Sequence, residues 1–215
     1  MTAAPARIEA LRHLLAQRFP VAPRTTGRLL PTGIPALDHA TGGLPLGAIT
    51  EIVCSGPSCG GQLLLGQLLN ATRATRTRVA LIDSTDAFDP ASFAGDLLAH
   101  LVWVRCAGAT AALHAADLLT RDANLGLVVL DLRGASSVDL RRIPSQQWYR
   151  LQRAVEPADL TLVVATPRAT VPSAQVRFEL GAVHDIAALE RDRTTLIAEL
   201  APALQRQRLH SAAAS

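Results

Sequence analysis

Six short, apolar segments alternate with stretches of helical periodicity along this sequence, and this alternation constrains the fold more than any other feature. The expected strands cover residues 49–54, 78–83, 101–106, 126–132, 160–166 and 175–180, and the expected helices cover residues 61–74, 90–100, 109–121, 144–155 and 185–209. Continuously apolar strands are buried on both faces, and helical crossovers connect parallel neighbours. The pattern therefore predicts an α/β fold with a mostly parallel, twisted sheet and helices on both of its faces. The last strand alternates polar and apolar residues, so we expect it near an edge.

The chain is expected to consist of a core over residues 30–182 and two flanking segments. Residues 1–29 form an N-terminal helix and linker, because five apolar residues at helical spacing predict an amphipathic helix over 6–19: Ile8, Leu11, Leu14, Leu15 and Phe19. This helix could pack on the chain's own sheet or on a neighbouring subunit of a homo-oligomer. Residues 183–215 are expected to form a C-terminal helical extension.

The composition narrows the functional classes. Every one of the 21 basic residues is arginine, and the formal net charge is only +3. A dedicated nucleic-acid binder usually has a stronger basic footprint, so we expect DNA binding to be weak or indirect. The three cysteines, Cys54, Cys59 and Cys106, lack metal-ligand spacing, and we expect no metal. No apolar run is long enough to span a bilayer and the N-terminus lacks an apolar signal core, which predicts a cytoplasmic protein without membrane contact.

The segment "GPSCGGQL", residues 56–63, lies between an apolar run and a helical stretch. Gly56 and Gly61 keep the spacing of a phosphate-binding loop, whose pattern is G-x-x-x-x-G-K-[ST]. Gln62 stands in place of the lysine that neutralises terminal phosphates, and Leu63 in place of the hydroxyl that ligates magnesium. We expect the two glycines to remain because the strand-to-helix turn needs their backbone freedom.

The surroundings of this loop resemble the core of the RecA recombinase family over roughly residues 30–180. The resemblance rests on "LPTGIPALDHATGGLPLGAITEIVCSGPSCGG", on "LIDSTDAFDP" and on "LVVLDL". It places Thr85 where the family has the glutamate that activates water, and Thr166 where it has the glutamine that senses the γ-phosphate. Asp131 is the one acid of the hydrolytic set that remains, unless it is simply a cap at a strand end. The resemblance thus implies a degenerate nucleotide site with ATP binding weak or absent, no cofactor and no ATPase activity.

The two DNA-binding loops of the recombinases correspond here to residues 133–147 and 167–175. The second is short and contains Pro167 and Pro172, which indicate a stiff turn. The first keeps Arg133, Arg141 and Arg142. These arginines could touch DNA phosphates or a partner protein, or form a solvated face; we favour the last two.

One branch of the RecA relatives matches both the degenerate nucleotide site and the reduced DNA-binding loops. The chain resembles ImuA-type proteins, the RecA-like members of the bacterial damage-inducible mutagenesis cassette, which are often grouped with SulA-type cell-division inhibitors. The resemblance implies a non-enzymatic adaptor in translesion synthesis. Its partners would be a Y-family-like polymerase subunit, an error-prone replicative-type polymerase and the recombinase itself. Two other functions stay open, a weak nucleotide-gated DNA-binding ATPase and a cell-division inhibitor.

The expected C-terminal helix is the candidate partner-binding element. Its leucines lie along one side and its arginines elsewhere, and Pro202 should kink or break it near Glu199. Such a helix could lie in a partner's groove or close the chain's own core. On the first view, deletion from Glu199 onward should leave a folded domain. The candidate contact residues are Leu196, Leu200, Leu204, Arg206 and Arg208.

Overall fold

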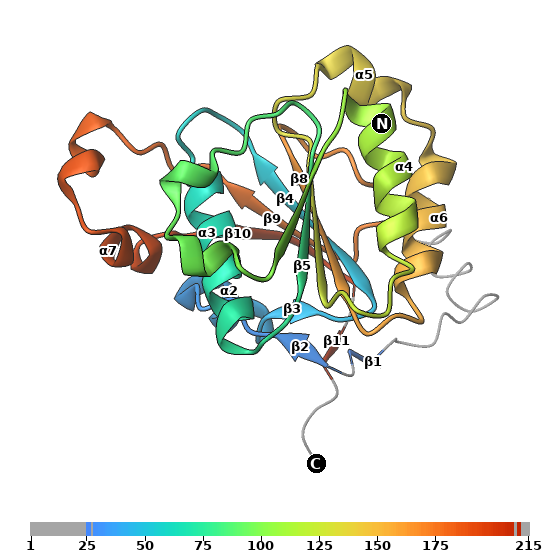
Figure 1. Ribbon diagram of the computed structural model, residues 1–215, viewed down its shortest axis with the longest axis horizontal. Coiled ribbons are helices and arrows are strands. Elements are labelled where there is room, and N and C mark those ends of the chain that lie inside the picture. Colours follow the sequence, from blue (N-terminus) through green and yellow to red (C-terminus); the bar gives the residue numbers. More distant parts are fainter. Residues whose placement is uncertain (1–24, 27, 209, 212–215) are drawn as a thin grey trace, which may run out of the picture.

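A seven-stranded sheet of order β10-β9-β4-β8-β7-β5-β6 forms the centre of the computed structural model, which describes residues 25, 26, 28–208, 210 and 211 (Figure 1). Six neighbouring strands are parallel, and β10 (Ala203–Gln207) runs antiparallel to β9. The mostly parallel sheet predicted from the sequence is confirmed. The six parallel strands are β4 (Ala48–Cys54), β5 (Val79–Asp83), β6 (Leu101–Arg105), β7 (Leu127–Asp131), β8 (Thr161–Thr166) and β9 (Val176–Leu180). The helix expected over residues 6–19 lies outside the described residues.

Helices cover both faces of the sheet, as predicted. The helices α2 (Pro35–Thr41) and α3 (Gly61–Ala74) lie on one face, and α4 (Ala109–Leu119) and α6 (Ser145–Val155) lie on the other (Figure 1). The leucines of α3 recur every three to four residues, which builds one aliphatic core cluster. The small alanines of α4 allow this helix to sit close to the sheet in the second cluster.

The entry segment before β4 is more ordered than a linker. The strands β2 (Leu29–Leu30) and β3 (Leu44–Pro45) pair antiparallel around α2, a helix that the sequence did not predict. Pro35 begins this helix and Gly42, with φ 76°, ends it in the left-handed region. Three further elements complete the fold: β1 (Thr25–Thr26), β11 (His210–Ser211) and α5 (Ser137–Arg142). Among the described residues, none of the helices combines the length and apolar character needed to cross a membrane.

Two predicted helices are wrong. Residues 90–100 form two 3₁₀ turns, η1 (Pro90–Ser92) and η2 (Gly95–Leu98), because a proline and a glycine interrupt the run. Residues 185–209 form η3 (Ile186–Glu190), α7 (Arg193–Ala198) and then the strand β10. The chain leaves the helical conformation before Pro202, and residues 203–207 pair with β9 as a strand instead. The expected C-terminal helical extension is therefore not formed.

Because the long C-terminal helix is not formed, the residues expected to bind a partner through it lie in other environments. Leu196 and Leu200 are buried in the core rather than displayed. Leu204 and Arg206 lie on β10, with Arg208 directly after it. β10 covers β9, so residues 175–180 form the strand next to the edge of the sheet, which agrees with their expected position near an edge.

A buried carboxylate fixes the connection between β8 and β9. Glu51, on β4, is fully buried. Its Oε1 accepts hydrogen bonds from Oγ1 of Thr166 (3.0 Å) and from the main-chain N–H groups of Thr170 (2.6 Å) and Val171 (3.1 Å). Its Oε2 accepts a hydrogen bond from Nε of Arg177 at 2.6 Å. The segment that leads from β8 to β9 is thus anchored to the centre of the sheet, as a stiff turn requires.

Candidate functional site

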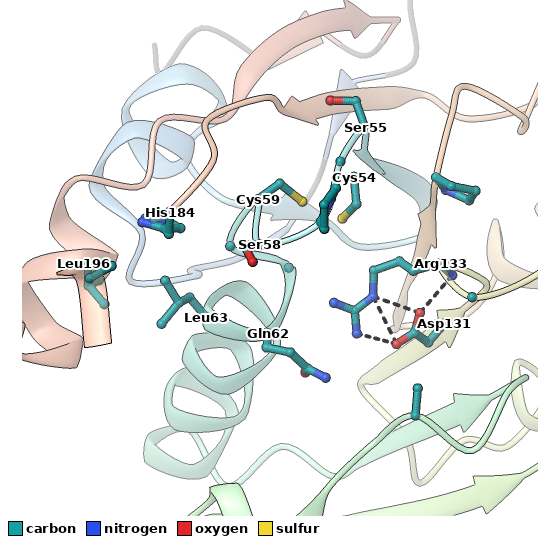
Figure 2. A pocket seen from close by; sticks show the side chains of 18 of the residues that line it. Cys54, Ser55, Ser58, Cys59, Gln62, Leu63, Asp131, Arg133, His184 and Leu196 are labelled. Atoms are coloured by element: carbon teal, nitrogen blue, oxygen red, sulfur yellow. Dashed lines mark hydrogen bonds and ion pairs between the residues drawn. The ribbon is translucent and has the colours of Figure 1, made fainter. Parts of the chain in front are cut away.

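A pocket of about 730 Å³ lies at the C-terminal end of β4, where the loop of residues 55–60 leads into α3 (Figure 2). Ligands of open parallel sheets bind at this end of the strands. Several residues singled out in the sequence meet here, namely Gly56, Gly61, Gln62, Leu63, Asp131, Arg133 and Leu196. The first N–H groups of an α-helix have no acceptor within the helix, so the start of α3 offers donors to the pocket. The loop therefore keeps the architecture of an anion site.

The backbone of the loop is constrained at two residues that the sequence pattern does not contain. Ser58 has φ 54° and Gly60 has φ 90°. A side chain at Gly60 would also collide with Leu200. Gly56, by contrast, has neither a positive φ nor a neighbour within contact distance of a Cβ. The expectation that the turn needs the freedom of Gly56 is wrong, and the glycine with this role is Gly60.

Arg133 fills the space beside the loop. Its Nε donates to both carboxylate oxygens of Asp131, at 2.9 and 3.1 Å, and its Nη2 donates to Oδ2 (Figure 2). A Cβ at Gly61 would collide with Nη1 of Arg133, which shows how closely the guanidinium lies against the start of α3. Burial lowers the pKa of Arg133, but the hydrogen bonds and charge of Asp131 outweigh it, and the pKa lies above its ordinary value. Asp131, the one acid that remains of the hydrolytic set, is thus paired with an arginine of its own chain.

The two residues that replace the phosphate-binding lysine and hydroxyl differ in environment. Gln62 is exposed. Leu63 is partly buried and packs on the core cluster, and it points to the side where Leu196 and His184 lie (Figure 2). Gln62 supplies no positive charge, and Leu63 supplies no metal ligand. Among the described residues, no group of three or more His, Cys, Asp or Glu side chains is placed to hold a metal ion.

Thr85 and Thr166 do not line the pocket. Thr85 packs against Gly134, and the hydroxyl of Thr166 is bonded to Glu51 on β4. The turn that carries Thr85 is held by Asp83, whose carboxylate accepts hydrogen bonds from the main-chain N–H groups of Thr85 (3.2 Å) and Phe88 (2.8 Å). Burial raises the pKa of Asp83, but these and further hydrogen bonds prevail and lower it. Both threonines therefore take part in local packing and hydrogen bonding outside the pocket.

The C-terminal segment forms one wall of the pocket, which sequence reasoning missed. The N–H of His184 donates to the carbonyl of Ser58 at 2.9 Å, and Leu200 contacts Gly60. Ala188 and Leu189 also line the cavity. The sequence contained one signal for this arrangement, since Leu196 and Leu200 share a spacing that closes a core as readily as it fills a groove.

The remaining candidate residues lie elsewhere. Arg141 and Arg142 are exposed on α5 and do not line the pocket. Of the three arginines named together in the sequence, only Arg133 belongs to the site. Their exposed position fits a solvated face, a partner contact or a DNA contact equally well, so their role stays a prediction.

The pocket also contains two buried thiols, those of Cys54 and Cys59 (Figure 2). Burial, together with the neighbouring Cys59, raises the pKa of Cys54 from 9.0 to about 12, although Arg133 acts in the opposite direction. In the unfolded chain this thiol ionises near pH 9, whereas in the folded chain it stays protonated. The contribution of Cys54 to stability is therefore complete below pH 9 and declines as the pH rises toward 12.

We expect the free energy of unfolding of the wild type to fall by up to about 1.4 kcal/mol per pH unit above pH 9 because of this thiol. Urea denaturation at a series of alkaline pH values measures the slope. Cys54→Ala should unfold with a shallower slope, while Cys106→Ala, at a partly exposed thiol, should keep most of it. Equal slopes for the wild type and Cys54→Ala would contradict the prediction.

Comparison with known proteins gives one similarity. The sequence is 40% identical over 122 residues to Protein RecA of Clavibacter michiganensis subsp. michiganensis (strain NCPPB 382), which corresponds to 54% of this chain and 31% of that protein. The chain thus spans about a third of the length of this curated relative. No family model matches the sequence. The similarity and the strand order of the sheet together support a RecA-like α/β fold and a RecA-like relationship.

Proposed function

We propose that this chain is a non-enzymatic RecA-like adaptor in SOS-induced translesion DNA synthesis, which acts through contacts with other proteins of the mutagenesis machinery. The partners proposed from the sequence are a Y-family-like polymerase subunit, an error-prone replicative-type polymerase and the recombinase. A role in DNA repair accords with the similarity to Protein RecA. The finer assignment to translesion synthesis rests on the sequence resemblance described above.

The observation that carries the proposal is the pairing of Asp131 with Arg133 beside the loop. A magnesium–nucleotide complex would need the carboxylate of Asp131 for its metal and the space beside Gly61 for its phosphates. Both are taken by the guanidinium of Arg133. Gln62 and Leu63, in place of the lysine and the hydroxyl, further support the proposal of a chain without phosphoryl-transfer activity.

We therefore expect no ATP hydrolysis by the purified chain, with or without single-stranded DNA. Each of the two lost contacts to charged phosphate or metal is worth roughly 1.5–3 kcal/mol, so the dissociation constant for MgATP should be about two to four decades above that of an intact site. Phosphate-release assays and titration with a fluorescent ATP analogue measure both quantities. Turnover at the rate of a recombinase would favour the nucleotide-gated ATPase instead.

Restoring one group should not restore the activity. Gln62→Lys is expected to leave the free energy of unfolding nearly unchanged, because the side chain is exposed, and to produce no ATPase. The same lysine combined with Arg133→Ala tests whether the guanidinium blocks the site, since it frees Asp131. An active enzyme from Gln62→Lys alone would mean that Arg133 and Thr85 do not limit the chemistry.

The cellular role is tested by damage-induced mutagenesis. Cells that lack this chain should lose most of the induced mutations, and Gln62→Ala should restore them as well as the wild type does. If the loop variant fails while still folded, the nucleotide site is functional. If instead the wild type arrests division when overproduced and has no effect on mutagenesis, the division-inhibitor function replaces the adaptor.

A further inference from the structure

Two arginines at the edge of the sheet share one neutral acceptor. Nη1 of Arg206 and Nη1 of Arg208 each lie 3.3 Å from the carbonyl oxygen of Pro172. Beside them, Nη2 of Arg177 donates to the carbonyl of Val171 at 3.0 Å. Glu51 neutralises Arg177, but no carboxylate of the described residues forms an ion pair with Arg206 or Arg208. Three guanidinium groups thus lie close together, and among the described residues only that of Arg177 is paired with a carboxylate.

The electrostatics of this group favour an additional anion. Burial lowers the pKa of Arg206, and repulsion by Arg177 and Arg208 lowers it further. On the same strands, Glu179 is half-buried, accepts a hydrogen bond from Gln205 at 3.1 Å and makes no ion pair with Arg206. A carboxylate placed between Arg206 and Arg208 would relieve this repulsion and receive charge-assisted hydrogen bonds.

The same two arginines border an open strand edge. β10 is the last strand of the seven-stranded sheet among the described residues. The N–H of Arg208 donates to the carbonyl of Gln175, toward β9, at 2.8 Å. Because successive main-chain groups of a strand point in opposite directions, the N–H and C=O of Gln207 point away from β9. Arg206 and Arg208, two residues apart, lie on one face of the strand.

We propose that the edge of β10 binds an extended acidic segment of a partner protein, which adds to the sheet as a further strand and places carboxylates beside Arg206 and Arg208. Main-chain ladder bonds and arginine–carboxylate pairs would act together in this mode of recognition. The inference rests on the proposed adaptor function, because it specifies the chemistry of the partner. The proposal keeps Arg206 and Arg208 as partner-binding residues but places them at a strand edge instead of on a helix.

A peptide explains the features of this edge better than two alternatives. A nucleic acid could neutralise the arginines, but it could not continue the ladder of main-chain N–H and C=O groups. The chain's own residues 1–24 contain four arginines and one glutamate, so their charge does not complement Arg206 and Arg208. An acidic, extended partner segment satisfies both the charge and the ladder.

The experiment uses the full chain and a fluorescently labelled peptide of alternating glutamate and valine as the probe. Fluorescence anisotropy should detect saturable binding that weakens as salt is added. Four competitors identify the recognition: the unlabelled acidic peptide itself, the same peptide with lysine in place of glutamate, the same acidic peptide with N-methylated main-chain amides, and a single-stranded oligonucleotide. We expect only the unmodified acidic peptide to compete well.

Variants test the contribution of the two arginine charges separately from that of the main-chain groups at the strand edge. Arg206→Glu with Arg208→Glu should weaken binding by about tenfold or more, since each lost charge-assisted pair is worth more than 1 kcal/mol. Gln207→Pro removes an outward N–H from an edge position where proline is tolerated, and should weaken binding while the circular dichroism spectrum is retained. The matched controls are Arg73→Glu with Arg78→Glu, at exposed arginines outside this edge, and Gln207→Ala; both should bind as the wild type does.

The possible results distinguish strand addition from the alternatives. Failure of the acidic peptide to bind, or equal binding of the N-methylated peptide, overturns strand addition. Stronger competition by the oligonucleotide, lost in the double arginine variant, assigns the surface to nucleic acid instead. The proposed function fails separately, through ATP turnover or unaffected mutagenesis, because neither measurement depends on the peptide.

Discussion

Replacing Glu51 by alanine is expected to lower the free energy of unfolding by about 3–5 kcal/mol, the effect of breaking a buried ion pair from one side. The carboxylate is fully buried and accepts four hydrogen bonds, including the one from Arg177. Its removal leaves the guanidinium of Arg177 without its counter-charge and two main-chain N–H groups without an acceptor. Since domains of this kind are stable by about 5–15 kcal/mol, urea denaturation should show a large shift of the midpoint.

A matched series tests the cause of this effect. Thr166→Val removes one hydrogen bond to the same carboxylate and should cost only about 1 kcal/mol. Arg177→Met leaves the carboxylate buried without its cation and should cost about as much as Glu51→Ala. Glu51→Leu combined with Arg177→Met should be less destabilised than either single loss of charge, because no uncompensated charge remains. Additive effects of the two single changes would contradict the interpretation as one coupled pair.

The part of the fold that the sequence predicted is the part held by repeated local signals. The strands from β4 to β9 are short, and most of them are continuously apolar, so periodicity found them within one residue at each end. The C-terminal part lacked such repetition. Leu189 and Leu196 fit one face of a helix, although Pro202 disfavours a continuous helix. That residues 203–207 form a strand depends on their pairing with β9, and the spacing of residues does not reveal this partner.

Only part of the candidate site was predicted from the sequence. The loop at Gly61 and the acid at Asp131 follow from position at strand ends, and the structure brings them to one pocket. That Arg133 would turn back onto Asp131 could not be read from the sequence, because an arginine two residues after a strand can as readily face solvent. Thr166 likewise showed its role only once Glu51, more than a hundred residues earlier, was placed beside it.

Deleting residues from Glu199 onward is expected to unfold or aggregate most of the protein, which reverses the expectation from the sequence. The deletion removes Leu200, which is 2% exposed and packs on Gly60 of the loop. It also removes β10, and so exposes the edge of β9 to pairing with other chains. Size-exclusion chromatography and circular dichroism of the truncated chain measure the outcome.

Point variants measure how much of this loss of stability comes from the core and how much comes from β10. Leu200→Ala alone should destabilise the fold by about 2–5 kcal/mol, whereas Leu204→Ala, at a side chain that is 40% exposed, should cost much less. A truncated chain that remained monomeric and as stable as the wild type would show that neither Leu200 nor β10 supports the fold. Because the truncation disturbs folding and the β10 edge together, loss of mutagenesis in it would not identify a partner contact. The double replacement of Arg206 and Arg208, which leaves Leu200 and the ladder to β9 in place, is the variant that can.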